Sequence, residues 1–397
     1  METEKIISKI FFALVLILFF YFLYFGITTT PAQLRESDSL AYHIPIAQKL
    51  TSGSFLPPDL PLGLGHYPAV AETILSLFII LGLPLNTFNV LGFAFLFYFS
   101  KKTGESFGLS KEVSVIFAVS IVTLQSVLRW PLSQTVDIWL AAFFLAALYF
   151  LMSVKRDVSD FFKLGVALGF LVGTKYSGLF YAIALMAIFG KTFLQKVQIT
   201  KIIALVTPLT FLGFSWYFRN YLLTGNPFYP GNFWFFQGHP DFPRTDFVNW
   251  TLGGNIVKNS TILWKFIEAE VSEFLGWVLA LALPLYAFVK RKIANNILSL
   301  CQLGVLTFFI FIFILPTWPG IIVSNLRFTY PTMASLILAA FLMFKKHSPE
   351  LFSFSLLNVM GAVINLSYHP KLFLLVLLPV FYIVFVNKKV FKWVLEL

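Results

Sequence analysis

One short polar segment could carry acid–base chemistry in a chain that is otherwise mostly apolar. Residues 35–45 contain two carboxylates, at Glu36 and Asp38, followed by Tyr42 and His43. A positioned carboxylate can take the proton of a hydroxyl group as that group attacks a substrate. The alternative is that Asp38 only caps the helix expected to follow it. Because capping does not account for the tyrosine and histidine that follow, we predict that Asp38 is catalytic.

A second carboxylate, Asp137, begins an apolar segment near residues 137–153. An acidic residue in the first turn of a helix is favoured by the helix dipole, and this alone could account for Asp137. Two nearby carboxylates can also divide acid–base work or hold an acceptor hydroxyl. Since Asp38 and Asp137 are expected at the same depth, we predict that both belong to one catalytic site.

Three cations stand at the ends of separate apolar segments. Lys175 interrupts an apolar stretch, whereas Arg219 and Arg327 each follow or precede aromatic residues. Guanidinium groups bind phosphate in a bidentate manner, so these side chains could surround a phosphate at the membrane surface. The alternatives are that Lys175 reaches water along its aliphatic stem and that the arginines form ordinary ion pairs.

The elements that would position these residues are membrane helices. Of the 397 residues, 58% are hydrophobic and 12% are charged, whereas a soluble domain carries roughly 25% charged residues. The apolar runs approach the roughly 20 residues that cross a bilayer. We therefore predict an all-α polytopic membrane protein with about twelve spans. The net charge of +11 follows from the topology given below, so we expect no nucleic-acid partner.

Hydropathy assigns each apolar run a place in one transmembrane domain, residues 1–397, without a separate soluble domain. External segments are expected at 28–70, which carries the catalytic motif, and at 220–268. Spans are predicted near 8–27, 85–100, 112–129, 137–153, 201–218, 272–289, 296–316, 329–344, 351–367 and 371–387, with shorter apolar segments at 69–82, 162–173 and 176–189. Gly165, Gly169 and Gly173 recur at every fourth residue, which favours close packing of two helices.

The distribution of basic residues predicts the orientation in the membrane. With the N-terminus inside, most lysines fall on the cytoplasmic side, in agreement with the positive-inside rule. Five of the seven arginines fall outside, where topology disfavours positive charge. We therefore predict a multi-pass protein of the cell membrane with both termini in the cytoplasm, an active site that faces outward, and an anionic ligand there.

Four segments resemble bacterial and archaeal family 39-type glycosyltransferases of the GT-C superfamily, which includes protein O-mannosyltransferases and aminoarabinose transferases. The four segments are Asp38–Pro45, His66-Tyr67-Pro68 with Glu72 shortly after, Gly173–Leu179 and Trp216–Pro230. The resemblance implies a GT-C-like bundle with an outward-facing site and a catalytic acid in the first external loop, which would be Asp38. A second external acid would correspond to Asp137. The chain departs from many relatives in having Asp38-Ser39 where they have paired acids.

The resemblance implies transfer of a hexosyl or pentosyl group from a dolichyl- or undecaprenyl-type polyprenyl-phosphate donor. The acceptor would be a hydroxyl of a lipid, glycan or protein on the outer face, and membrane lipids surround the chain. No cofactor is required. His43, His66 and His239 could ligate a divalent metal together with Asp38, but they lack the spacing of a helical metal motif, so we assign no metal ligands. The residues predicted to bind substrate are Glu36, Tyr42, His43, His66, Tyr67, Lys175, Tyr176, Arg219, Asn220 and Arg327.

Two rival functions remain open from the sequence. A transporter or flippase would show inverted repeats and charges near the membrane midplane, whereas the charges here gather at the outer ends of the spans. A non-catalytic subunit of lipid-glycan assembly would keep the cations without needing Asp38. Separate measurement of donor binding and turnover would distinguish these functions.

Overall fold

The computed structural model describes residues 2–34, 36–152, 155–193, 197–233, 235–242, 251–270, 280–281, 294–316 and 326–345, and six residues between 351 and 359. Within these ranges every regular element is a helix. This confirms the predicted all-α class. The isolated bridge between Thr251 and Pro316 is too short to form a strand.

The first half of the chain forms long helices separated by a segment of short helical turns, which was predicted to be external. The long first helix is α1, Glu2–Thr28. The segment predicted to be external holds α2 (Pro31–Leu34), a π-helical turn (Ser39–His43), α3 (Ile44–Thr51) and a 3₁₀ turn (Pro61–His66). The helices that follow are α4 (Val70–Ile80), α5 (Phe88–Ser106), α6 (Lys111–Val122), α7 (Gln125–Leu128) and α8 (Asp137–Leu151).

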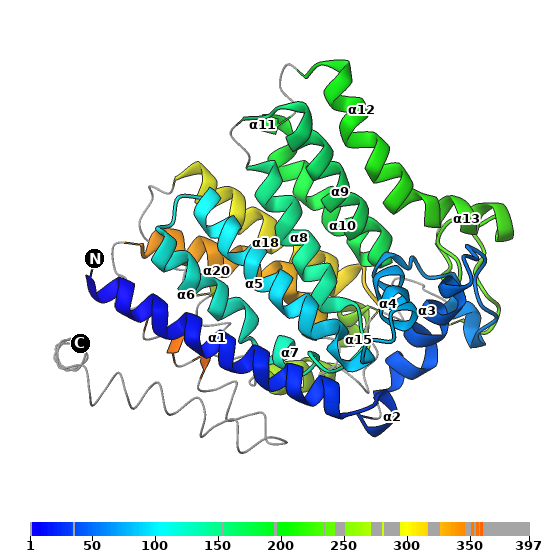
Figure 1. Ribbon diagram of the computed structural model, residues 1–397. Coiled ribbons are helices and arrows are strands. Elements are labelled where there is room, and N and C mark those ends of the chain that lie inside the picture. The colour runs from blue at the N-terminus through cyan, green and yellow to red at the C-terminus, as the bar shows by residue number, and fades with distance from the viewer. Residues whose placement is uncertain are drawn as a thin grey trace.

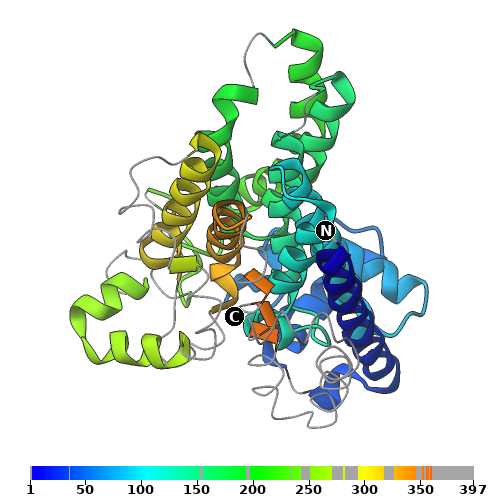
Figure 2. The same cartoon turned by 90° about the vertical axis from the view of Figure 1, so that its left-hand side faces the viewer.

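The second half continues the bundle and adds a pair of helices at its side. The elements are α9 (Val158–Thr174), α10 (Tyr176–Leu185), α11 (Lys191–Phe193), α12 (Ile199–Pro208), α13 (Ser215–Thr224), α15 (Leu252–Lys258), α16 (Thr261–Glu270), α18 (Asn295–Phe313) and α20 (Tyr330–Met343). In Figure 2 the yellow-green pair α15 and α16 stands at one side of the bundle. Helix α15 and most of α16 lie within residues 220–268, which were predicted as an external segment.

The helices run back and forth between two ends of the molecule. Figure 1 shows the N-terminus and α11 toward the upper left, and α2, α3, α4 and α13 toward the lower right. Helices α5, α8 and α9 connect these two ends. The segments predicted to be external therefore gather at one end, and the short connections between α5 and α6 and between α8 and α9 lie at the other.

Helix α8 forms the centre of this bundle. Nearly all of its side chains are buried, including those of Trp139, Phe144 and Leu148, because it packs against both α5 and α9. A helix that is apolar on all sides is stable only when neighbours or lipid surround it. Since α8 begins with Asp137, the core of the bundle ends in a carboxylate that neighbouring elements must satisfy.

Glycines bring α9 close to the segment that begins with α12. A side-chain β-carbon added at Gly165 would lie 2.2 Å from the carbonyl oxygen of Leu205, and one at Gly169 would lie 2.8 Å from that of Pro208. These distances leave no room for a larger residue. The every-fourth-residue glycine pattern thus serves the helix packing that was predicted from it.

Within the described residues, three helices are long and apolar enough to cross a membrane, at Glu4–Thr28, Ile199–Thr224 and Asn295–Phe313. Shorter apolar helices lie at Val70–Ile80, Asp137–Leu151, Tyr176–Gly190 and Arg327–Met343. These helices support a membrane protein, but the predicted number of twelve spans is not confirmed. The spans predicted near 272–289, 351–367 and 371–387 lie wholly or largely outside the described residues.

Some boundaries differ from those predicted by hydropathy. The span expected near 112–129 ends at Val122, and the short α7 follows it. The helix expected near 201–218 continues to Thr224 and ends where Gly225 adopts a positive φ of 73°. Glycine adopts this left-handed conformation without steric cost, so it terminates the helix beyond the apolar stretch.

Candidate active site

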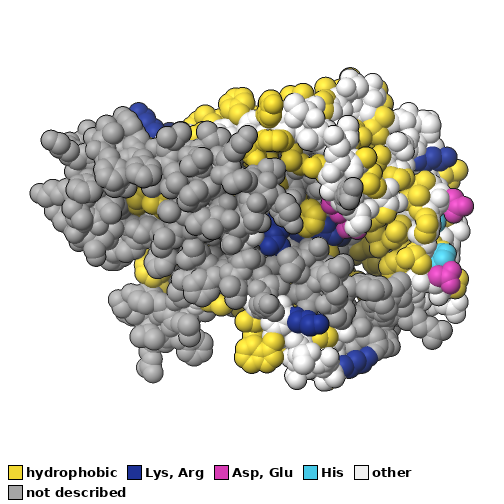
Figure 3. Space-filling model, turned by 90° about the horizontal axis from the view of Figure 1, so that it is seen from below, with side chains coloured by type: hydrophobic (Ala, Val, Ile, Leu, Met, Phe, Trp, Pro, Cys, Tyr) yellow, Lys and Arg dark blue, Asp and Glu magenta, His cyan; other side chains and the backbone are white. Residues whose placement is uncertain are grey.

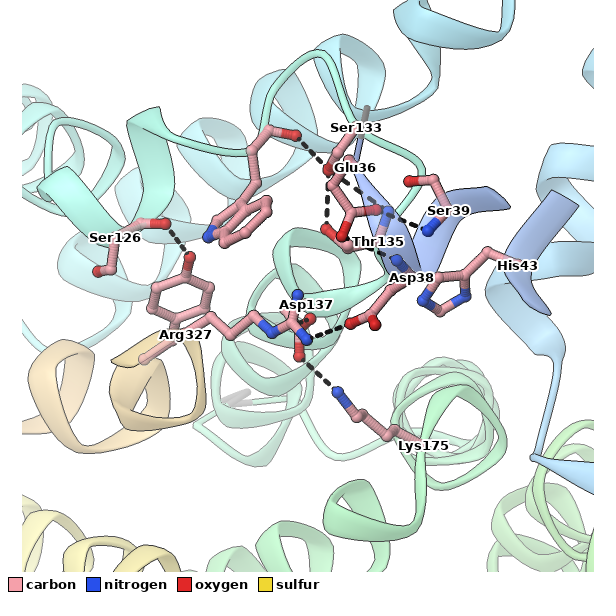
Figure 4. Close-up of polar contacts among 12 residues, drawn as sticks. Glu36, Asp38, Ser39, His43, Ser126, Ser133, Thr135, Asp137, Lys175 and Arg327 are labelled. Atoms are coloured by element: carbon pink, nitrogen blue, oxygen red, sulfur yellow. Dashed lines mark hydrogen bonds and ion pairs between the residues drawn. The ribbon is translucent and has the colours of Figure 1, made fainter. Parts of the chain in front are cut away.

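Two acids and two cations predicted from the sequence meet at the end of the bundle that carries residues 28–70. Nη2 of Arg327 donates a hydrogen bond to Oδ2 of Asp38 over 2.5 Å. Nζ of Lys175 donates to Oδ1 of Asp137 over 3.0 Å, and Nε of Arg327 lies 3.2 Å from Oδ2 of Asp137. Figure 4 shows Asp38, Asp137, Lys175 and Arg327 converging, and we refer to them as the ion-pair cluster.

Each member of the ion-pair cluster comes from a different break in helical structure. Asp38 precedes the π-helical turn, and Asp137 is the first residue of α8. Lys175 has an extended backbone between α9 and α10, and Arg327 lies in a 3₁₀ turn before α20. Helix ends leave backbone groups unpaired and admit polar side chains, so the charges are placed where the apolar bundle can best accommodate them.

The four side chains differ in exposure. The Asp38 and Lys175 side chains are 31% and 21% exposed, whereas those of Asp137 and Arg327 are 1% and 6% exposed. Arg327 also has a buried Nη1 without a hydrogen-bond acceptor among the described residues. A buried charged donor in this state favours an anionic partner. The cluster therefore combines an accessible carboxylate with cations that can accept an anion.

Aromatic rings border the two cations. The guanidinium carbon of Arg327 lies 5.1 Å from the ring centre of Trp130, and Nζ of Lys175 lies 4.3 Å from that of Phe328. Such contacts stabilise cations that have been removed from water. Figure 3 shows one face of the molecule, on which a few Lys, Arg, Asp and Glu side chains lie among hydrophobic side chains. Trp130 and Phe328 were not among the predicted site residues, although both adjoin a predicted outer end of a span.

The backbone around Asp38 is held by other polar groups. The Glu36 carboxylate accepts hydrogen bonds from the backbone N–H groups of Asp38 and Ser39, over 3.0 and 2.6 Å. The Asp38 side chain makes no capping hydrogen bond, so the capping alternative does not describe its role. Ser39 Oγ accepts a hydrogen bond from the backbone N–H of Gln134 over 2.9 Å. This contact links the Asp38 segment to the loop that leads into Asp137.

A second group of predicted residues forms a separate network, which we call the loop network. The backbone carbonyl of His66 accepts hydrogen bonds from Arg219 and from Asn220, each over 2.8 Å. Asn220 also donates to the hydroxyl of Tyr176 over 2.8 Å, and that hydroxyl donates to the carbonyl of Tyr229 over 2.5 Å. Arg219 is therefore not grouped with Lys175 and Arg327, as the predicted phosphate site required, but holds the external segment in place.

The remaining predicted residues pack between these two groups. The ring of Tyr42 contacts those of Tyr67 and His43, with centroids 5.6 and 4.1 Å apart. Nδ1 of His43 lies 2.6 Å from Oε1 of Glu72 in α4. Burial lowers the pKa of His66, and Arg219 lowers it further. Glu72 entered the sequence prediction only through the resemblance, because its separation from His43 has no helical or strand period.

Metal ligands do not gather at this site within the described part of the chain. No group of three or more His, Cys, Asp or Glu side chains there is arranged to hold a metal ion. The described side chains can supply acid–base catalysis by a carboxylate and stabilisation of an anion by two cations.

Comparison with solved structures shows a related fold. The chain is similar to ArnT from Cupriavidus metallidurans, with 14% identity and a TM-score of 0.58 for the apo state. For ArnT bound to undecaprenyl phosphate the identity is 15% and the TM-score is 0.57. Each match covers 95% of this chain and 65% of the ArnT chain, so the chain spans just under two thirds of that protein's length.

A more distant match is the oligosaccharyltransferase of Archaeoglobus fulgidus in complex with zinc and sulfate. Its identity is 16% and its TM-score 0.48, over 92% of this chain and 52% of that one. No protein-family model and no curated protein sequence matches the chain. The similarity to the ArnT structures confirms the predicted fold, and the apolar helices agree with a membrane protein.

Proposed function

We propose that the protein is a membrane glycosyltransferase that moves a sugar from a polyprenyl-phosphate donor to a hydroxyl group of an acceptor. The observation that carries this proposal is the ion-pair cluster, in which an accessible Asp38 adjoins two cations at the end of an apolar GT-C bundle. Such a fold can host more than one function, so the chemistry of the site decides between them. A phosphate leaving group needs fixed cations, and an attacking hydroxyl needs a base.

In the proposed reaction the acceptor oxygen attacks the anomeric carbon of the sugar. The new bond forms as the bond between that carbon and the phosphate oxygen breaks, through a transition state with oxocarbenium character. Asp38 takes the proton of the acceptor hydroxyl. Lys175 and Arg327 stabilise the lipid phosphate that leaves, and the buried Asp137 holds both cations in place.

The donor class is supported from two sides. The exposed part of Lys175 and the unpaired Nη1 of Arg327 fit a phosphate group. The solved ArnT structure of similar fold holds undecaprenyl phosphate. We further propose that the site faces outward, since the segments around it carry few of the lysines that mark the cytoplasmic side. The acceptor is proposed only as a hydroxyl of a lipid, glycan or protein.

Replacement of Asp38 tests the proposal directly. In membranes supplied with polyprenyl-phosphate sugars, Asp38→Asn should lower sugar transfer by about 100- to 10,000-fold, because the amide cannot take the proton. Asp59→Asn, in the same external segment but exposed, is the matched control and should transfer at the wild-type rate. Normal transfer by Asp38→Asn would show that Asp38 is not the base.

The same experiment addresses the rival functions. A non-catalytic subunit would bind polyprenyl phosphate but show no transfer in either wild type or variant. A transporter would move the labelled lipid between leaflets without forming a glycosidic bond. Product analysis by mass spectrometry therefore distinguishes a transferase from both rivals, and an assay of the labelled lipid in each leaflet distinguishes the transporter from the subunit.

A further inference from the structure

Two buried polar side chains that the proposed chemistry does not use lie beside the Asp38 segment. His43 is 2% exposed and Glu72 is 1% exposed, and the distance from Nδ1 of the first to Oε1 of the second is 2.6 Å. The second carboxylate oxygen of Glu72 has no hydrogen-bond partner among the described residues. Glu72 thus depends on the imidazole for its side-chain contact in this part of the chain.

Burial of this pair lowers the stability of the fold. Burial of a carboxylate costs several kcal/mol before any partner is counted, and apolar residues of similar volume often replace such pairs without loss. Around Glu72, helix α4 buries Val70, Ala71 and Leu75, so an apolar side chain would suit the position. The pair is therefore better explained by a functional role than by a contribution to stability.

The position of His43 in the chain indicates that this role concerns the Asp38 segment. His43 is the last residue of the π-helical turn that begins immediately after Asp38. Short π-helical turns are rare and occur often at functional sites. The start of this turn is held by Glu36 and by the contact of Ser39 with Gln134. The contact with Glu72 holds its end, so both ends are attached to the surrounding structure.

The orientation of the His43 ring also supports a role for this residue beside Asp38. Nδ1 of His43 is engaged by Glu72, so Nε2 is the ring nitrogen that remains for a second contact. Figure 4 shows the ring on the side of Asp38 that is away from Arg327. Asp38 thus lies between a guanidinium on one side and the imidazole on the other.

We propose that Glu72 and His43 form a positioning pair for Asp38. Glu72 accepts the Nδ1 hydrogen of His43, and the imidazole fixes the π-helical turn so that the Asp38 carboxylate faces the acceptor hydroxyl. The inference rests on the proposed function in one respect, namely that Asp38 is the base. It adds two residues that act through Asp38 and do not touch the reacting atoms.

The pair predicts a defect in turnover without a defect in donor binding. Glu72→Ala should lower kcat for sugar transfer by about a hundredfold, because a small displacement of a reacting group has an effect of that size. Its affinity for undecaprenyl phosphate should stay within about twofold of wild type, since Lys175 and Arg327 remain in place. A merely structural role would instead lower binding, folded yield and kcat together.

Two conservative variants of His43 separate its ring nitrogens. The amide nitrogen of His43→Asn can replace Nδ1 and keep the bond to Glu72, so this variant should retain most of the activity. His43→Gln places its amide near Nε2, loses the bond to Glu72 and should be as slow as Glu72→Ala. The matched control is Glu105→Ala. This glutamate pairs with Lys101 and Lys102 in the last turns of α5, at the end of the bundle away from Asp38.

Hydrogen exchange gives a readout that does not need turnover. Amide exchange in residues 36–51 should be faster in Glu72→Ala and His43→Gln than in wild type or Glu105→Ala. Unchanged exchange, unchanged kcat, or equal losses of kcat and donor affinity would each overturn the positioning pair. If Asp38→Asn is inactive while the Glu72 variants behave as wild type, only this inference fails. If Asp38→Asn remains active, the assignment of the base in the proposed function fails.

Discussion

Asp38 and Asp137 share a cation but occupy different environments. Both contact Arg327, yet the Asp38 side chain is 31% exposed and that of Asp137 is 1% exposed. A general base must reach the proton that it removes, and this favours Asp38. A buried acid between two cations instead compensates their charge. Two carboxylates with the same partner are thereby suited to different tasks.

Lys175 provides the first prediction at the residue scale. Lys175→Met should weaken binding of undecaprenyl phosphate to the purified protein by about tenfold or more, because a charge-assisted hydrogen bond contributes about 1.5–3 kcal/mol. Equilibrium binding measures this effect. Lys102→Met is the control, since Lys102 pairs with Glu105 at the other end of the bundle. Equal affinities for the two variants would remove Lys175 from the phosphate site.

Truncation of Asp137 should lower the stability of the protein more than truncation of Asp38. Asp137→Ala leaves Lys175 and Arg327 buried without their shared carboxylate, so the free energy of unfolding should fall by roughly 3–5 kcal/mol. Asp38→Ala should cost less, because its carboxylate is partly exposed and Arg327 keeps Asp137. Thermal unfolding in detergent compares the two variants. The reverse order of stability would contradict the charge-compensating role of Asp137.

The sequence predicted the members of the ion-pair cluster better than it predicted their grouping. Asp38, Asp137, Lys175 and Arg327 each interrupt or end an apolar run, and that is the signal by which they were found. Arg219 has the same signal, but its guanidinium binds backbone carbonyls of the external segment. Which partner an arginine meets depends on tertiary contacts over more than 150 residues, and hydropathy carries no such information. The proposed roles of all these residues stay predictions.

At the scale of elements, the positions of several helices agree with those predicted, whereas the predicted number of spans is not confirmed. Helices α8, α18 and α20 begin or end within a few residues of the predicted spans, because long apolar runs define them. The break at α7 was missed, since Val122 to Leu128 is apolar enough to read as one span with α6. Hydropathy detects burial or contact with lipid, and it does not distinguish a continuous helix from two short ones.

The close contact of α9 with the segment that begins with α12 predicts that a larger side chain between them lowers stability. Gly169→Val should lower stability by about 1–3 kcal/mol, because the added carbons meet the carbonyl of Pro208 and the side chain of Leu212. Sugar transfer should fall as well, since α9 ends at Lys175. Phe162→Leu is the control on the same helix, at a side chain that is 50% exposed. Thermal unfolding of both variants tests the packing, and equal stability would contradict it.

At the scale of the molecule, the two ends of the bundle predict a membrane orientation. In a Cys301→Ala background, a membrane-impermeant maleimide applied to intact cells should label Ser52→Cys, which lies beside the external end of α3. It should not label Ser159→Cys, which lies near the start of α9 at the opposite end, until the membrane is opened. Both positions are exposed. Labelling of Ser159→Cys alone in intact cells would reverse the proposed topology.

The pairing of Arg327 with Asp38 spans 289 positions of the chain and has a consequence for biosynthesis. While the chain is being made, Asp38, Asp137 and Lys175 emerge well before Arg327. The ion-pair cluster therefore stays incomplete until the segment that carries Arg327 has folded against the earlier helices. Its assembly is a late event that depends on the second half of the chain.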